Sequence, residues 1–158
     1  MSIFNFFRKK PEPIVINNEL GTFILQNPKK DRFYSGYIKW LDNDIDVSLH
    51  CDGVDSLTAD TELENLRKIV ADADKWDKKI RKYIADDMSD KDGLIEIWSD
   101  DTKITKKEFL NRISIGFMHI YPNGEIYFDY DMNGMFTEHS VGIWTDFSGK
   151  ISWCALWG

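Results

Sequence analysis

The sequence predicts an α+β domain: a mainly antiparallel sheet from two strand meanders, with two or three helices packed on it. Two stretches of alternating apolar and polar residues predict the meanders, and between them apolar residues recur every three or four positions, as in amphipathic helices. Asp-Asn-Asp and Pro-Asn-Gly turn sequences interrupt the alternating stretches. The 158 residues suffice for one hydrophobic core, so we expect a single domain, residues 19–158, after a flexible leader of residues 1–18.

The first meander is expected to contain three strands. Residues 20–26 form the first, and residues 33–41 and 45–51 form a hairpin around Asp42-Asn43-Asp44. Alternation assigns one face of this hairpin to the core and the other to polar side chains. The core face carries Tyr34, Gly36, Ile38, Trp40, Ile45, Val47, Leu49 and Cys51, and the opposite face carries Ser35, Tyr37, Lys39, Asp46, Ser48 and His50.

The middle of the chain predicts helices that cover the sheet. One apolar stripe runs over residues 63–73 and a second over residues 76–88. Thr61 with Glu64, and Thr105 with Glu108, have the spacing of capping boxes, in which a hydroxyl and a carboxylate satisfy the first backbone N–H groups of a helix. A short third helix is therefore expected to begin at Thr105. The loop before it is expected to bury Trp98.

The second meander contains the strongest turn signal in the chain, Pro122-Asn123-Gly124, because Asn-Gly accepts the positive φ values of a tight hairpin. A two-residue Asn-Gly loop would place Phe117 opposite Tyr130 and His119 opposite Phe128, so His119 is expected in the core. Two further strands complete the meander, residues 139–145 and 150–157.

The leader combines a short apolar patch with basic residues. Residues 3–7 are mostly apolar, Arg8, Lys9 and Lys10 follow, and the stretch lacks the cleavage site of a signal peptide. Weak contact of residues 1–10 with an anionic membrane surface is one hypothesis, and a leader that is flexible or packs on itself is the other. The two cysteines show neither metal-ligand spacing nor the density of a disulfide scaffold, which favours a cytoplasmic location.

Negative charge is concentrated in two stretches of the chain. The formal net charge is −7, residues 42–64 contain eight acids and no Lys or Arg, and residues 113–149 contain five acids and no Lys or Arg. Such a surface repels phosphate backbones, which argues against nucleic acid as a partner, and it attracts basic proteins. Acidic loops that only keep the protein soluble are the simpler explanation.

The leading hypothesis is a non-catalytic protein-binding domain with an acidic surface, similar in style to immunity proteins that neutralise a toxin. Aromatic residues make up 14% of the chain, and partly exposed aromatic side chains dominate interface energetics. Trp153 and Trp157 lie on one face of the last predicted strand, where they either bind a partner or close the core. The candidate partner-binding residues are Asp42, Asp44, Asp46, Asp52, Asp55, Trp153 and Trp157.

An Asp/Glu/His cluster gives the alternative function, an enzyme or a metal-binding protein. Its members are Asp129, Asp131, Glu138 and His139, which adjacent strands can bring together. A calcium loop starting at Asp129 is disfavoured because Ser140 stands where the bidentate Glu is required. A His139 that bonds a backbone carbonyl is the structural alternative. No nucleophile elbow or Gly-rich phosphate loop occurs, so we predict no cofactor and consider an enzyme the less favoured reading.

Several short motifs resemble an uncharacterised bacterial family, domain-of-unknown-function family 2262. They are Leu20-Gly21-Thr22-Phe23, Tyr34-Ser35-Gly36-Tyr37-Ile38-Lys39-Trp40, Trp76-Asp77, Trp98, Thr105-Lys106-Lys107-Glu108-Phe109-Leu110, Ile120-Tyr121-Pro122-Asn123-Gly124, Phe136 and His139. The likeness extends over residues 20–145. It implies a bacterial, cytosolic protein without an assigned activity or cofactor, and it supplies no catalytic residue.

Overall fold

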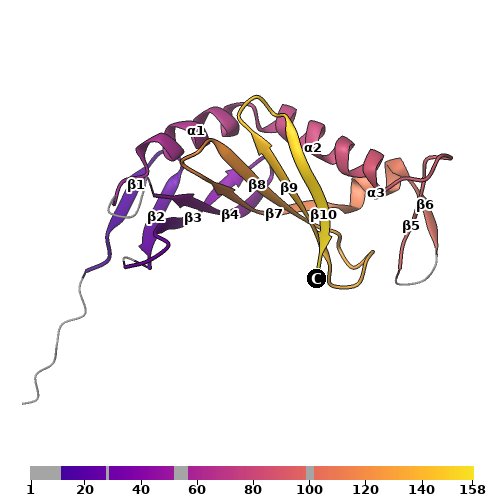
Figure 1. Ribbon diagram of the computed structural model, residues 1–158, viewed down its shortest axis with the longest axis horizontal. Coiled ribbons are helices and arrows are strands. Elements are labelled where there is room, and N and C mark those ends of the chain that lie inside the picture. Colours follow the sequence, from indigo (N-terminus) through magenta and orange to yellow (C-terminus); the bar gives the residue numbers. More distant parts are fainter. Residues whose placement is uncertain (1–11, 28, 52–56, 99–101) are drawn as a thin grey trace, which may run out of the picture.

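The computed structural model describes residues 12–27, 29–51, 57–98 and 102–158. Its main feature is an eight-stranded sheet with the order β1-β2-β3-β4-β7-β8-β9-β10 (Figure 1). The strands are β1 (Val15–Asn18), β2 (Gly21–Gln26), β3 (Phe33–Trp40), β4 (Asn43–His50), β7 (Ser114–Ile120), β8 (Glu125–Asp131), β9 (Ser140–Asp146) and β10 (Ile151–Trp157).

One parallel contact joins two antiparallel groups of strands into this sheet. Strands β1 to β4 pair antiparallel in chain order, and so do β7 to β10, whereas β4 and β7 run parallel. A parallel pair requires a long crossover connection. Here the crossover contains the helices α1 (Asp60–Ala71) and α2 (Ala73–Asp87), and later α3 (Lys106–Arg112).

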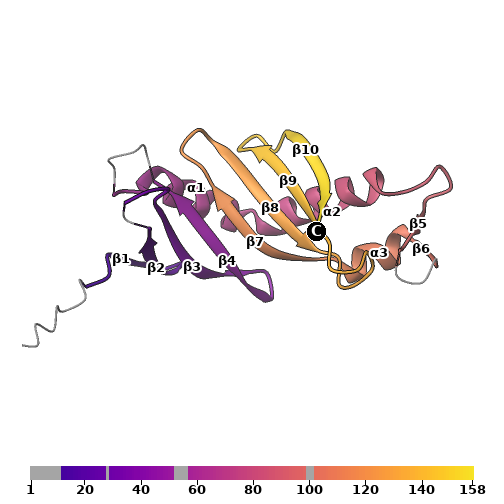
Figure 2. The ribbon, with the colours of Figure 1, turned by 60° about the horizontal axis from the view of Figure 1, so that its bottom comes forward.

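The helices α1 and α2 lie along the same face of the sheet and leave the opposite face uncovered (Figures 1 and 2). No helix in the described residues is both long and apolar enough to cross a membrane. A small two-stranded sheet, β5 (Leu94–Glu96) with β6 (Lys103–Thr105), extends beyond α2.

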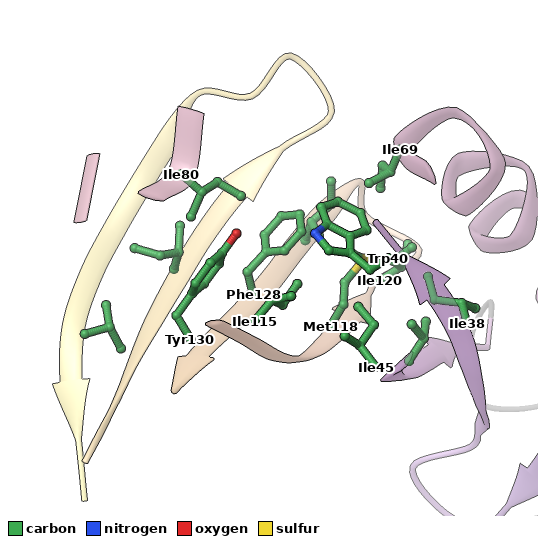
Figure 3. Close-up of a cluster of buried hydrophobic side chains, with 14 of the residues drawn as sticks. Ile38, Trp40, Ile45, Ile69, Ile80, Ile115, Met118, Ile120, Phe128 and Tyr130 are labelled. Carbon is green, nitrogen blue, oxygen red and sulfur yellow. The ribbon is translucent and has the colours of Figure 1, made fainter. Parts of the chain in front are cut away.

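The hydrophobic core lies between the helices and the covered face of the sheet. Figure 3 shows Trp40 and Phe128 beside Ile69 of α1 and Ile80 of α2, and all four are buried. The hydroxyl of Tyr130 donates a hydrogen bond of 2.9 Å to Oδ1 of Asp77, so a strand and α2 are also joined by a buried polar contact. The packing of α1 and α2 against the sheet therefore holds the strands in place.

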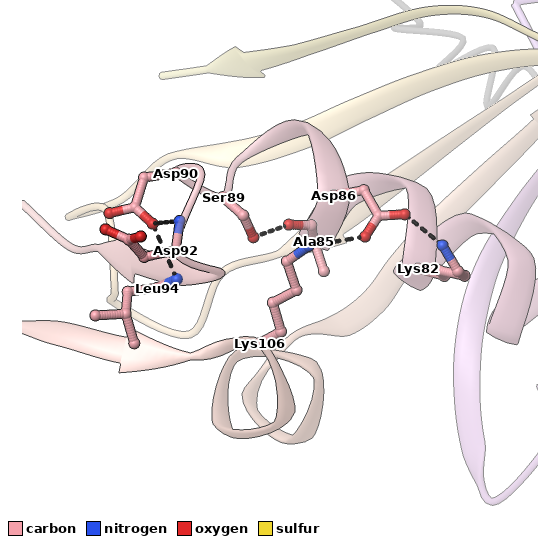
Figure 4. A network of polar contacts seen from close by, with 8 residues as sticks. All are labelled: Lys82, Ala85, Asp86, Ser89, Asp90, Asp92, Leu94 and Lys106. Carbon is pink, nitrogen blue, oxygen red and sulfur yellow. Dashed lines mark hydrogen bonds and ion pairs between the residues drawn. The ribbon is translucent and has the colours of Figure 1, made fainter.

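Polar contacts hold the end of α2 against α3 and shape the turn that leads into β5 (Figure 4). The carboxylate of Asp90 accepts backbone hydrogen bonds from Asp92 at 2.9 Å and from Leu94 at 3.1 Å, which shapes the turn into β5. The ammonium of Lys106, in the first turn of α3, lies 3.1 Å from Asp86 of α2. These contacts anchor the second part of the crossover to α2.

Much of the predicted architecture is confirmed. The fold is α+β with a mostly antiparallel sheet, and β3 and β4 pair antiparallel with the expected residues on each face. The hairpin loop is Leu41-Asp42 and not within Asp42-Asn43-Asp44, so Tyr37 lies opposite Asp46. Thr105 and Glu108 form the expected capping box at α3. The box expected at Thr61 is wrong, because the N-cap of α1 is Ala59, two residues earlier, with no side-chain cap.

Three further predictions are corrected. Val15–Asn18, expected in the flexible leader, form β1 and pair with β2. Trp98 is not buried: its side chain is 54% exposed. His119 lies opposite Tyr127 and not opposite Phe128, because the hairpin loop holds three residues, with the amide of Tyr121 bonded to the carbonyl of Glu125 at 2.9 Å. A register shift of one residue moves every side chain to the other face.

Candidate functional site

The open face, defined as the side of the sheet that α1 and α2 leave uncovered, is the candidate functional site (Figure 2). The strand registers decide which side chains lie on it, because paired residues share a face. Its central members are Tyr37, Lys39, Asp44, Asp46, Ser48, His50, Phe117, His119, Tyr127, Asp129, Ser140, Trp144, Trp153 and Trp157.

An aromatic band, made of a central cluster of rings and a pair of tryptophans on β10, lies on the open face. The ring of Tyr121 stacks on His50, with centroids 4.2 Å apart, and on Trp144, with centroids 5.2 Å apart. Trp153 and Trp157 contact each other at the outer strand and are 39% and 53% exposed. The alternative in which these two tryptophans close the core is therefore wrong. Exposed apolar patches are common at the binding surfaces of proteins.

Two histidines meet in the middle of this band. Nε2 of His50 and Nδ1 of His119 lie 3.0 Å apart, so one ring donates a hydrogen bond to the other. Burial, followed by the proximity of His119, lowers the pKa of His50 to about 4, although the carboxylate of Asp31 opposes the shift. Burial also lowers the pKa of His119. Both rings are therefore neutral near pH 7.

Asp129 is a nearly buried carboxylate on the open face, with 7% of its surface exposed. Its Oδ2 atom accepts hydrogen bonds from the hydroxyl of Tyr127 at 3.1 Å and from the hydroxyl of Ser140 at 2.8 Å. Burial raises the pKa of Asp129, and the two hydroxyl donors only partly oppose that shift. Burial and the charge of Asp129 raise the pKa of the Tyr127 phenol.

Gly142 leaves space that two neighbouring side chains occupy. A Cβ atom at this position would lie 2.5 Å from the hydroxyl oxygen of Tyr127 and 2.6 Å from Nε1 of Trp157. Since real Cβ atoms do not approach other atoms this closely, only glycine accepts the present arrangement. The absence of a side chain here positions Tyr127 for its bond to Asp129.

The four residues of the predicted metal cluster line one cavity of about 530 Å³. Nδ1 of His139 is held by the carbonyl of Phe136 and the hydroxyl of Thr137, both at 2.9 Å. Within the described ranges, no three His, Cys, Asp or Glu side chains are arranged to hold a metal ion. The cavity thus gathers Asp129, Asp131, Glu138 and His139, and their metal-binding role stays a prediction.

The predicted partner-binding acids divide between described and undescribed residues. Asp42, Asp44 and Asp46 are exposed, and Asp44 forms an ion pair of 3.2 Å with Lys39. Asp52 and Asp55 lie outside the described residues, as do the residues 1–10 proposed to contact a membrane. Pairing between strands aligns Asp46, Phe117 and Asp129 in one row, so a phenyl ring lies between two carboxylates.

One known protein family matches the residues that form almost the whole sheet. Residues 17–156 match the model of a family described as "Uncharacterized protein conserved in bacteria (DUF2262)". The chain belongs to this family. The match confirms the resemblance carried by the motifs and includes every strand that contributes to the centre of the open face. No curated protein and no solved structure matches this DUF2262 member.

Proposed function

We propose that this DUF2262 member is a non-catalytic protein-binding domain whose open face docks on a basic protein. The row of Asp46, Phe117 and Asp129 carries the proposal, because an aromatic ring between carboxylates suits the ammonium or guanidinium group of a partner's side chain. An immunity-like protein that neutralises a basic toxin is the specific form that we favour.

The charges along the strands support a basic partner. Within the paired strands, the open face includes six carboxylates and one ammonium group, that of Lys39, and Lys150 lies opposite Asp146 just before β10. The carboxylates belong to Asp44, Asp46, Glu125, Asp129, Asp131 and Asp146. Complementary charge speeds association with a basic surface, and the aromatic band supplies apolar area for a desolvated centre.

Charge reversal on the open face tests this proposal. At low salt, the wild type is expected to capture proteins from a lysate of the native host that the double variant Asp44→Lys with Asp46→Lys does not capture. High salt is expected to release the same proteins from the wild type. Asp74→Lys is the matched control, since Asp74 is an exposed acid on α2, on the other side of the sheet. Capture that is insensitive to salt and to the open-face variant would contradict the proposal.

One observation favours an alternative function, acid–base or metal chemistry at the cavity of Asp129 and His139. A nearly buried carboxyl group with a raised pKa inside a cavity is typical of reactive sites as well as of structural ones. Titration with zinc and manganese distinguishes the two functions. A thermal shift that Asp129→Asn and His139→Ala both abolish would support the alternative, and no shift would exclude its metal form.

A further inference from the structure

The outermost strand β10 has the properties of a pairing edge. Within the described residues it pairs only with β9, so its other backbone edge faces away from the sheet (Figure 1). Its sequence, Ile-Ser-Trp-Cys-Ala-Leu-Trp, contains no charged residue and no proline. Edge strands normally carry charges, prolines or covering segments that prevent pairing with another chain. Except for a register irregularity between Ile151 and Trp153, β10 has no charge and no proline, and no described strand pairs with its outer edge.

The side chains of β10 are more exposed than those of a buried strand. Trp153 and Trp157 are 39% and 53% exposed, and Cys154, Ala155 and Leu156 are partly exposed. The opposite edge strand, β1, has only four residues, two of them asparagine. Long, apolar and uncharged edges are the ones that add a further strand. The asymmetry between the two edges therefore singles out β10.

We propose that β10 pairs antiparallel with β10 of a second copy of this chain, about a two-fold axis at Ala155. This register places Trp153 opposite the second copy's Trp157, and Cys154 opposite the second copy's Leu156. Each pair joins residues of the same face, since Trp153 and Trp157 lie on the open face and Cys154 and Leu156 on the helix-covered face. The strand is thus complementary to itself, as a two-fold interface requires.

Charge explains why a second copy, and not the basic partner, fits this edge. Each copy has a net charge of −7, so two copies repel wherever their carboxylates meet. Strand β10 contains no carboxylate, which makes it a strip where two acidic molecules can approach. A basic protein finds no carboxylate on β10, so its charges fit the acidic residues of the inner strands better. Pairing would also join the two open faces into one continuous surface and bring four indole rings together.

A charge placed on the two-fold axis tests the pairing. Wild-type protein is expected to sediment at twice the 18.5 kDa chain mass as its concentration rises. We expect Ala155→Lys and Ala155→Glu each to stay monomeric at every concentration, because like charges then face each other across the axis. Mixing the two variants is expected to restore the dimer, since opposite charges then meet.

Ile24→Lys serves as the matched control, because Ile24 is an apolar residue on β2 with 40% exposure, far from β10 in the sheet. This variant is expected to dimerise like the wild type. Thermal unfolding of each variant verifies that it is folded. A monomeric wild type, or charged variants at Ala155 that dimerise unchanged, would overturn the proposal, and a mixture that remains monomeric would overturn the axis at Ala155. Sedimentation without any partner keeps this test separate from that of the proposed function.

Discussion

Nε2 of His50 and Nδ1 of His119 lie 3.0 Å apart although 69 positions separate the residues in the chain. The parallel pairing of β4 with β7 creates this contact, because it aligns Ser48 with His119 and so brings the next open-face residue of β4 within reach. The pair is thus a direct product of the crossover through the helices. It also makes the stability of the domain sensitive to mild acid.

We predict that the free energy of unfolding falls as the pH drops from about 6.5 to about 4. The folded pKa values of His50 and His119 lie below the unfolded value, so the unfolded chain binds more protons in this window. Because His50 is only partly buried, we expect a loss of about 1–2 kcal/mol. Urea unfolding at several pH values measures it.

The double variant His50→Gln with His119→Gln is the control for this prediction. Its unfolding free energy should lack the histidine contribution, so the difference between wild type and variant should shrink towards acid pH. Asp129, whose pKa is raised by burial, acts in the opposite direction and remains in both proteins. A difference that does not depend on pH would show that the two rings do not resist protonation.

A second prediction concerns Gly142. Gly142→Ala should lower the free energy of unfolding by about 1–3 kcal/mol, because the added methyl group collides with Tyr127 and Trp157. Tyr127→Phe removes the hydroxyl oxygen that lies closest to the new carbon, so it should recover part of this loss in a double-mutant cycle. Denaturant unfolding of the four proteins gives the coupling.

Gly116→Ala is the matched control for Gly142→Ala. Gly116 also lies beside Asp129, but the nearest atom to its added Cβ would be 3.7 Å away, an ordinary contact distance. We expect its stability to change by less than about 1 kcal/mol. Equal losses of unfolding free energy in the two variants would mean that the close contacts at Gly142 do not restrict a side chain at this position.

The sequence predicts the local features of this fold better than its long-range pairings. The faces of the β3–β4 hairpin and the Thr105 capping box follow from alternation and from short spacings, which are local properties. The register of β7 with β8 depends on whether the loop holds two or three residues, and Asn123-Gly124 is compatible with both. That single residue decides whether His119 enters the core or joins the open face.

The sequence therefore predicts only part of the candidate site. Asp129, Asp131, Glu138 and His139 follow each other closely, and a common cavity does contain them. The contact between His50 and His119 needs both the correct hairpin register and the parallel pairing of β4 with β7, and no short motif encodes either. The exposure of Trp153 depends on the position of β10 at the edge of the sheet, which is also a long-range property.

A third prediction concerns the buried bond between Tyr130 and Asp77. Tyr130→Phe removes the donor that lies 2.9 Å from Asp77, leaving that buried carboxylate with Arg81 at 3.3 Å. We expect a loss of about 1–3 kcal/mol in the free energy of unfolding. Tyr37→Phe is the control, since Tyr37 is 66% exposed and should tolerate the change. Similar values for both variants would show that the bond contributes nothing measurable.

The last prediction compares the two sequence motifs with capping-box spacing. Thr105→Ala should cost about 1 kcal/mol, because the Thr105 hydroxyl accepts a hydrogen bond from the backbone amide of Glu108 at the start of α3. Thr61→Ala should cost much less, because Thr61 lies inside α1, whose N-cap is Ala59. Chemical denaturation of both variants measures the difference. An equal loss at the two threonines would indicate that Thr61, as its spacing with Glu64 suggests, and not Ala59, is the N-cap of α1 in solution.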